Sequence, residues 1–299
     1  MREDAFRRGK DVPSDNTDRA GYVMVLGASI AWSTGGFFVR LIDVELWTML
    51  GWRSLFGLLA ILVFTIWQRG LNKLQFRKLV SWPGLLIVAT TGGAMICFVV
   101  SNVLTSVANV AVLYATLPFV TAGLAWAWLA ERPSGRTLCA STAALMGVAA
   151  MASNSVGGGH LLGDLVAILM TVLTAVYTVT ARRYRNVPLL EAVVGGSAFA
   201  LAAGMLLGSP LSVHAADLAF LALFGAISMG LGMALFTVGA RRIPSAQAAL
   251  INALESPLAP FWVWLAFAEV PPPTTFIGGA FILAALGWHF AGELRTHET

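Results

Sequence analysis

The sequence predicts an all-α integral membrane protein whose ten transmembrane helices form two inverted five-helix repeats. Three observations lead to this prediction: an apolar composition, ten apolar runs of spanning length, and an internal repeat five runs long. Of the 299 residues, 58% are hydrophobic and 11% are charged, and the mean hydropathy is +0.78. A soluble domain carries about 25% charged residues. This chain therefore lacks the polar surface that a water-soluble fold requires.

Ten apolar runs have the length of a membrane span. A helix needs about 20 apolar residues to cross the hydrocarbon core of a bilayer. Runs bounded by charged residues, Gly or Pro occur at 21–39, 46–67, 82–104, 107–130, 137–153, 161–181, 189–207, 218–240, 246–268 and 274–291. The uncharged stretch 79–130 is too long for one helix, and we place a turn near Thr105 and Ser106. Segments 1–20 and 292–299 are polar tails, and the first lacks the apolar core of a secretory signal.

The basic residues test this count independently. All but two of the 19 Lys and Arg residues fall in the tails and connections on one side of the arrangement. Basic residues concentrate in cytoplasmic loops, so we expect both termini in the cytoplasm and a location in the cell inner (plasma) membrane. The exceptions are Arg40, in a connection on the other side, and Arg53, inside the second run. We expect Arg53 to act as an anchor that extends toward the outer surface.

Two segments of the chain resemble each other. Eleven residues separate Ser from Pro and four separate Trp from Glu in both copies: Ser106, Pro118, Trp126 and Glu131 match Ser245, Pro257, Trp264 and Glu269. The copies lie in the fourth and ninth runs, so the unit is five spans, and an odd number inverts the second copy. Inverted repeats are typical of secondary transporters, with the substrate site at the repeat interface near the midplane. We therefore expect repeats at 21–153 and 161–291.

The repeated prolines lie about halfway along their spans. Proline lacks the N–H that would bond the carbonyl four residues earlier, so Pro118 and Pro257 should leave the carbonyls of Tyr114 and Ala253 free. We expect both prolines to act as hinges. Static kinks whose carbonyls are satisfied by neighbouring groups are the alternative.

Polar and aromatic side chains inside the spans are candidates for a substrate site. Glu255 is an acid near the middle of a span, where an ionised carboxylate costs about 2.5 kcal/mol or more. We interpret it as a ligand for a substrate ammonium group or as a protonatable coupling group, with a packed neutral acid as the alternative. Asn252 lies on the same helix face. The other candidates for substrate binding are Trp32, Ser33, Asn102, Tyr114, Leu117 and Tyr177.

Other residues favour structural interpretations. Trp126, Trp128, Trp262 and Trp264 lie toward span ends, as an aromatic belt does. The four histidines, His160, His214, His289 and His297, fall in loops, a tail or an interface, and none forms a convincing proton relay.

Several segments resemble a known group of transporters. The run TSVANVAVLYATLPFVTAGLAWAWLAERPSGRTLCASTAALMGVAAM, its counterpart PSAQAALINALESPLAPFWVWLAFAEVPPPTTFIGGAFILAALGW, and the stretches AWSTGGFFVR and WRSLFG are similar to the drug/metabolite transporter superfamily and its EamA-type repeat. The second copy reads AEV where the first reads AER. The resemblance implies two inverted five-helix halves, a central cavity and small organic substrates. Bacterial exporters of aromatic amino acids and of cationic drugs such as paraquat are similar members.

These observations favour a carrier over an enzyme or a channel. The sequence has no His-Glu-x-x-His helix and no phosphate-binding Gly-rich loop ending in Lys-Ser or Lys-Thr. We expect no catalytic residues, no cofactor, no metal and no nucleic-acid partner. We expect a secondary transporter that exports small organic metabolites by alternating access, with aromatic or amphipathic amino acids and cationic drugs as its substrates. We expect a monomer or weak homodimer in the lipid bilayer. The alternatives are a channel-like facilitator and a carrier of the same superfamily for a nucleotide sugar or nucleoside.

Overall fold

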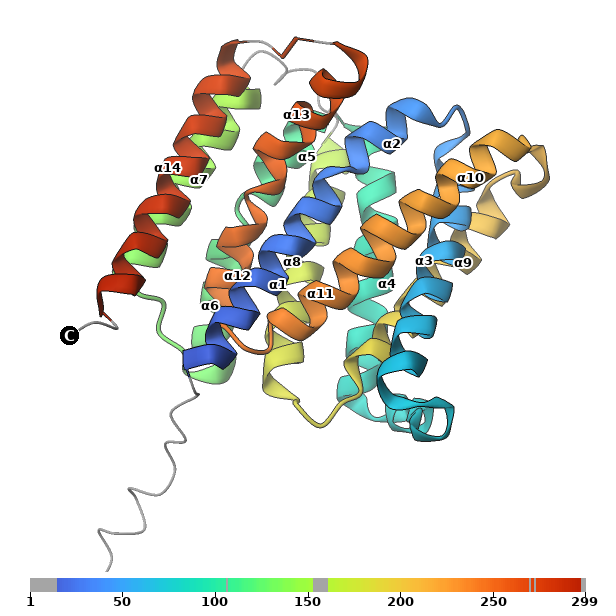
Figure 1. The fold of residues 1–299 in the computed structure, drawn as a ribbon, viewed down its shortest axis with the longest axis horizontal. Helices are drawn as coiled ribbons and strands as arrows, with labels where there is room; N and C mark the ends of the chain where they lie inside the picture. The colour runs from blue at the N-terminus through green and yellow to red at the C-terminus, as the bar shows by residue number, and fades with distance from the viewer. Residues whose placement is uncertain (1–14, 106, 153–160, 269, 272, 297–299) are drawn as a thin grey trace, which may run out of the picture.

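The computed structural model describes the backbone of residues 15–105, 107–152, 161–268, 270–271 and 273–296 (Figure 1). The tail residues 1–14 and 297–299, as well as Ser106, His160 and Glu269, lie outside the described residues. The regular elements are α1 (Asp15–Ser33), α2 (Gly35–Leu41), α3 (Leu46–Arg69), η1 (Leu71–Lys73), η2 (Phe76–Val80), α4 (Trp82–Leu104), α5 (Val107–Tyr114), α6 (Leu117–Leu129), α7 (Gly135–Ala152), α8 (Leu161–Arg183), α9 (Leu189–Leu207), η3 (Pro210–Ser212), α10 (Ala215–Phe224), the π-helical η4 (Gly225–Gly232), α11 (Met233–Gly239), α12 (Ser245–Asn252), α13 (Glu255–Phe267) and α14 (Pro273–Thr296).

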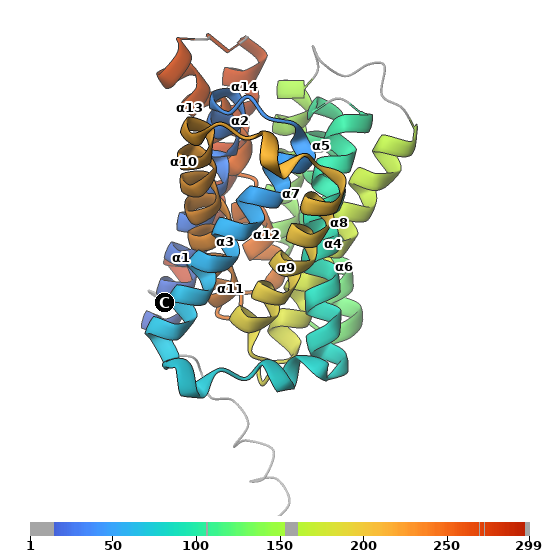
Figure 2. The same cartoon turned by 90° about the vertical axis from the view of Figure 1, so that its right-hand side faces the viewer.

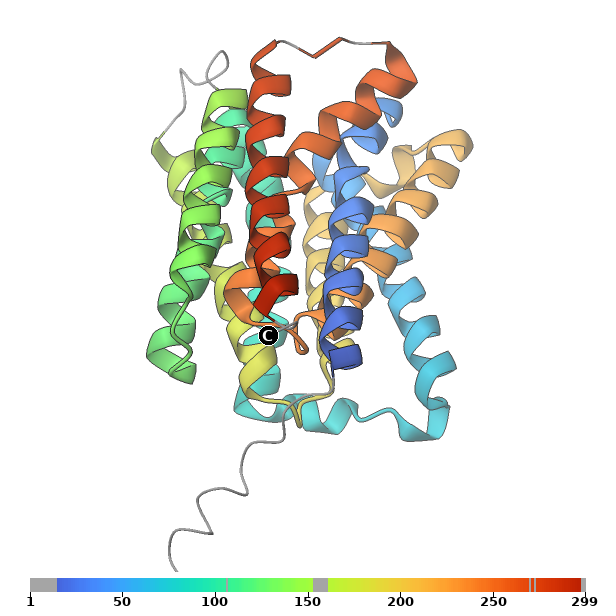
Figure 3. The ribbon, with the colours of Figure 1, turned by 60° about the vertical axis from the view of Figure 1, so that its left-hand side comes forward.

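The described helices form ten rods that run between two opposite ends of the molecule (Figures 1 and 3). Four rods consist of consecutive pieces: α1 with α2, α5 with α6, α10 with η4 and α11, and α12 with α13. Eight rods are long and apolar enough to cross a membrane, and α7 and α14 complete the ten. The predicted turn near Thr105 is confirmed, since α4 ends at Leu104 and α5 begins at Val107. The all-α membrane fold is therefore confirmed.

Basic side chains gather at one end, which we call the basic end. It carries Lys73, Arg77, Arg132, Arg182 and Arg241, all in or beside the connections after α3, α6, α8 and α11. The start of α1 and the end of α14 lie at this same end, at the bottom of Figure 1. Arg40, at the end of α2, lies at the opposite end. The fold thus reproduces the charge asymmetry that the sequence predicts.

The helix pairs follow the pattern of a repeat. Helix α3 packs along α9, and α7 packs along α14; each pair joins equivalent spans of the two halves. Glycines allow the close approach at both crossings: a Cβ on Gly204 would meet the backbone of Gly51, and a Cβ on Gly278 would meet the carbonyl oxygen of Gly147. Small residues permit such close contact between helices in a membrane, where lipid gives no hydrophobic driving force.

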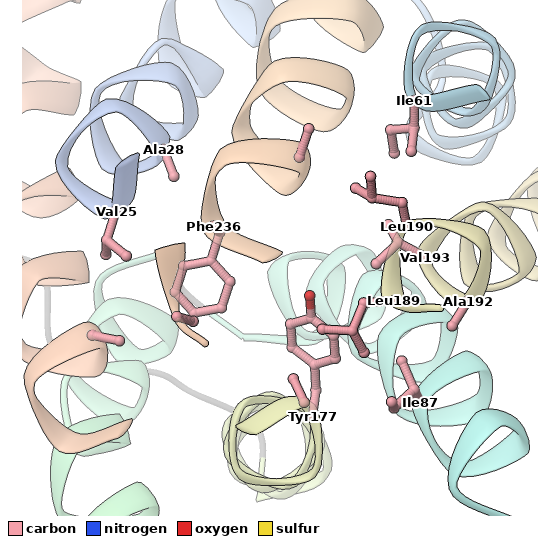
Figure 4. Packing of buried hydrophobic residues seen from close by; sticks show 14 of the residues in the cluster. Val25, Ala28, Ile61, Ile87, Tyr177, Leu189, Leu190, Ala192, Val193 and Phe236 are labelled. Atoms are coloured by element: carbon pink, nitrogen blue, oxygen red, sulfur yellow. The ribbon is translucent and has the colours of Figure 1, made fainter. Parts of the chain in front are cut away.

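The largest buried cluster lies toward the basic end. Phe236 of α11 and Tyr177 of α8 face each other there, with Ile61 of α3, Ile87 of α4 and Leu189 of α9 around them (Figure 4). The helices that contribute side chains to this cluster are therefore packed against one another near the basic end. The buried His289 of α14, 1% exposed, is also in the interior, unlike the loop or interface position that the sequence suggested.

Two sets of helices face each other across the molecule. The α1 group consists of α1, α2, α10, η4, α11, α12 and α13, and the α8 group consists of α4, α5, α6 and α8. In Figure 2, α10 and α13 lie on the left, whereas α4 and α8 lie on the right. The α1 group consists of the first, eighth and ninth spans, and the α8 group consists of their counterparts in the other repeat, the sixth, third and fourth spans. A site between the groups therefore lies at the repeat interface.

Candidate functional site

Both repeated prolines lie where a rod is broken. Helix α5 ends at Tyr114 and α6 begins at Leu117, with Pro118 in the first turn of α6. Helix α12 ends at Asn252 and α13 begins at Glu255, two residues before Pro257. The chain is therefore interrupted at equivalent points of the fourth and ninth spans.

The expectation that the Ala253 carbonyl is free is wrong. This carbonyl oxygen accepts a hydrogen bond from the Ser256 N–H at 3.2 Å, and the Leu250 carbonyl accepts from the Ala253 N–H at 3.0 Å. These bonds span three residues rather than four, so the chain tightens into a turn that satisfies the carbonyl which proline would otherwise strand. The interruption is a joint with its own hydrogen bonds.

The two pieces of the ninth rod differ in packing. All eight residues of α12 are buried, whereas no residue along the described length of α13 is fully buried. A hollow of about 230 Å³ lies between α13 and α14, beside Pro257 and Gly279. Helix α12 is thus fixed in the core, and α13 has room to tilt about the joint between them.

Glu255 lies at that joint, inside the ninth span, and is partly buried. Among the described residues its carboxylate has no hydrogen-bond or ion-pair partner. The Tyr114 side chain, from the equivalent joint of the α8 group, lies within electrostatic reach of this carboxylate and beside Thr174 of α8. The two joints therefore lie near each other, and we propose that a substrate cavity lies between them.

Trp32 and Ser33 come from α1, next to the break between α1 and α2. The Trp32 ring packs against Phe236 with 5.1 Å between centroids. The Ser33 hydroxyl is buried and accepts a hydrogen bond from the Trp262 indole N–H at 2.8 Å. Trp262 therefore turns inward, contrary to the aromatic-belt interpretation, because its N–H finds an acceptor in α1. Trp126 and Trp264 are 60% and 41% exposed, as a belt requires.

Asn252 joins α12 to α1. Its side-chain oxygen accepts from the Ser29 hydroxyl at 3.2 Å, while its Nδ2 is buried without a hydrogen-bond partner. Asn252 is 3% exposed, so it supports the wall rather than forming an open surface. The side chain of Asn102, on α4, lies outside the described residues.

Leu117 and Tyr177 lie between the two groups, below the proposed cavity. Leu117 is 2% exposed and packs between Ala175 of α8 and Ala249 of α12. The Tyr177 hydroxyl is 2.7 Å from the Thr237 hydroxyl of α11. Both contacts join the α8 group to the α1 group. These residues form a packed floor, and the sequence could not distinguish a floor from a wall because both use apolar and aromatic residues.

The expectation that the Arg53 side chain extends toward the outer surface is wrong. Its guanidinium carbon lies 4.9 Å from the centre of the Phe224 ring and 6.0 Å from that of Phe98. Its Nε is buried with no hydrogen-bond partner. The side chain therefore turns into the bundle instead of extending toward the surface. The two aromatic rings make this inward position favourable through cation–π attraction, and Phe224 lies some 170 residues away in the sequence.

Two arginines close the basic end between the groups. Arg182 of α8 pairs with Glu131 at 2.5 Å and also donates to the carbonyl oxygen of Ile243, in the link before α12. Arg241, in the same link, donates to carbonyls at the end of α8 and beyond: Ala181 at 3.2 Å, Tyr184 at 3.2 Å and Val187 at 2.7 Å. We call these contacts the arginine latch. Together with the floor, they join the two groups at the basic end.

A comparison with protein families decides the assignment. The model of the EamA-like transporter family matches residues 19–153 and again residues 161–289. The chain belongs to the EamA-like transporter family. This protein is therefore a multi-pass membrane transporter of small molecules and not an enzyme. The superfamily that the sequence resembles is thus confirmed.

Other comparisons add the fold alone. No curated protein matches the sequence significantly. Among 29 similar chains of solved structures is a crystal structure described only as that of a protein; it is 17% identical, has a TM-score of 0.75, and is matched over 90% of this EamA-like chain and 98% of its own. In the described part of the chain, no group of three or more His, Cys, Asp or Glu residues is placed to hold a metal ion.

Proposed function

We propose that this EamA-like protein exports small amphipathic solutes that carry an amino group, with aromatic amino acids as the first candidates and cationic drugs as the second. The observation that carries the proposal is the Glu255 carboxylate, which lies inside the ninth span, is partly exposed and forms no hydrogen bond or ion pair among the described residues. A carboxylate inside a membrane span is costly, and such residues are by default candidates for a functional site. A substrate ammonium group would supply the missing partner, and the nearby Tyr114 and Trp32 would contact an apolar or aromatic part.

We further propose transport by alternating access, with the basic end facing the cytoplasm of a cell inner membrane. The contacts that join the two groups concentrate at the basic end, in the floor and the arginine latch. The loosely packed α13 lies on the other side of the joint. This combination corresponds to a state closed toward the cytoplasm, and the two proline joints are the hinges that would permit the opposite state.

A counterflow assay with purified protein in liposomes tests the proposal. Liposomes preloaded with unlabelled phenylalanine should accumulate labelled phenylalanine, with saturation at high concentration, and competition by phenethylamine should reduce uptake. Glu255→Gln should abolish the competition by amines while the protein remains folded. Flux that does not saturate would support the channel-like facilitator. Exchange of nucleosides or nucleotide sugars, with no exchange of amines, would support the other carrier class.

A further inference from the structure

We infer that the groove between α13 and α14 binds an acyl chain of a membrane phospholipid, and that the bound chain restrains α13. The groove is the hollow of about 230 Å³ that lies beside the joint of the ninth rod. This inference goes beyond the proposed function, because it assigns a lipid site on the lipid-facing side of the bundle and does not depend on which solute is transported.

The groove has a local origin in the residues of its two walls. Pro260 lies inside α13 and lines the groove, and a proline inside a helix kinks it. On the other wall, Gly279 and Ala280 of α14 provide no side chain larger than a methyl group. A kinked helix beside a wall of small residues leaves space that the protein does not fill with its own side chains.

Two contacts join α13 to α14 along the groove. Near the joint, a Cβ added to Gly279 would lie 3.2 Å from the Cβ of Pro257. Farther along α13, the Trp264 ring meets the Phe276 ring edge-on, with 6.0 Å between centroids. Helix α14 is itself held against α7 at the glycine crossing described above. Helix α14 is therefore the fixed wall of the groove, and α13 is the wall that has room to tilt.

The surroundings of the groove identify its occupant as hydrocarbon. Phe261, Trp264, Phe276 and Leu283 line the groove and are between 41% and 54% exposed. Exposed apolar side chains on a membrane span face lipid, so the groove is continuous with the lipid-facing surface. Among the described lining residues, only Thr275 and the Trp264 indole carry polar side-chain atoms, so a charged ligand would lose its solvation there without compensation. An apolar cavity of about 150 Å³ accepts benzene, so this larger groove has room for a segment of an acyl chain.

A second copy of the chain fits the groove less well than a lipid chain does. Ten described residues line the groove, whereas a stable protein interface takes about 20–30 residues from each side. A single acyl chain needs no such area, because it gains dispersion contacts with both walls of a narrow space.

An acyl chain in the groove would act on the movement of α13. The groove lies beside Pro257, at the joint about which α13 can tilt. A tilt of α13 toward α14 would close the groove, and the chain would have to leave first. The bound chain therefore opposes this tilt.

Photo-crosslinking in liposomes locates the chain. The liposomes would contain a phosphatidylcholine with a diazirine midway along one acyl chain, and mass spectrometry would map the labelled residues after irradiation. Labelling at Leu283, in the groove, should exceed labelling at Met146 at least fivefold; Met146 is 56% exposed on α7, beside the glycine crossing with α14. Ala280→Phe should lower the labelling at Leu283 at least fivefold, because the ring fills the groove. Ala149→Phe makes the same substitution at an exposed position of α7 and should change this labelling by less than twofold.

Spin labels on the two walls report the restraint on α13. Leu265 of α13 and Ile277 of α14 are both exposed and lie outside the groove lining. The distribution of distances between labels at these positions should become narrower in Ala280→Phe, because the ring occupies the groove permanently. Ala149→Phe should leave the distribution unchanged.

Four outcomes would overturn the inference. Equal labelling at Leu283 and Met146 would reduce the site to general contact with the bilayer, and unchanged labelling in a folded Ala280→Phe would place the chain elsewhere. A disulfide between two copies that carry Ala280→Cys, with the native cysteines replaced, would assign the groove to a second copy. An unchanged distance distribution in Ala280→Phe would remove the restraint on α13. None of these measurements uses a transported solute, and the labelling of the unaltered protein remains decisive even where Ala280→Phe does not fold.

Discussion

We expect the arginine latch to set how often the proposed cavity opens toward the basic end, and Arg241→Ala measures its strength. Arg241 donates three hydrogen bonds, at 2.7 to 3.2 Å, to carbonyls at the end of α8 and in the link that follows it. A hydrogen bond that involves a charged group contributes about 1.5–3 kcal/mol when buried. The side chain is only partly buried, so we assign the three bonds together about 2 kcal/mol after allowance for solvent screening. Removal should favour opening by about 30-fold, since 1.4 kcal/mol corresponds to a factor of ten.

A cysteine in the floor reports that opening. Ala249, 2% exposed and packed against Leu117, lies between the cavity and the latch. We would introduce Ala249→Cys in a protein whose native Cys97 and Cys139 are replaced, and measure its reaction with an impermeant thiol reagent in inside-out vesicles. Because labelling follows the population of the open state, the rate should rise about 30-fold in Arg241→Ala.

Arg242 supplies the matched control. It is the neighbouring arginine in the same link and is exposed. Arg242→Ala removes the same charge, so it should change the labelling rate by less than twofold. Equal rates in the two variants would refute the latch, because charge near the membrane surface rather than the bonds to α8 would then account for any change.

Three further predictions concern the joints, the packing and the topology. Pro118→Ala or Pro257→Ala should continue the helix through the joint and slow counterflow, with substrate affinity changed by less than about tenfold, or ~1.4 kcal/mol; unchanged rates would show that the joints are static. Gly278→Leu should lower the thermal stability in detergent because α7 leaves no space for the side chain, whereas Gly287→Ala, with open space around it, should be tolerated. A cysteine at Ala215 should react with an impermeant reagent from outside the cell, and labelling only after membrane disruption would contradict the proposed orientation.

The sequence by itself determined the membrane fold and the positions where its spans begin and end. Hydrophobic runs of spanning length can satisfy their backbone in lipid only as helices, and charged connections mark where the runs stop. The break before Pro257 was also predictable, since a missing N–H is a local property of the chain. The family resemblance followed from the same local patterns, and the family match bears it out.

The tertiary structure decided which side chains face the cavity. Periodicity could not show that Tyr177 and Leu117 belong to the floor, because their burial depends on Thr237 and Ala249 in the other group. Arg53 illustrates the point most clearly. Its position near the outer end of a span favoured a surface anchor, but Phe224, supplied by a helix of the second half, holds the guanidinium inside. Contacts between residues so distant in the chain arise from helix packing, which a local pattern does not encode.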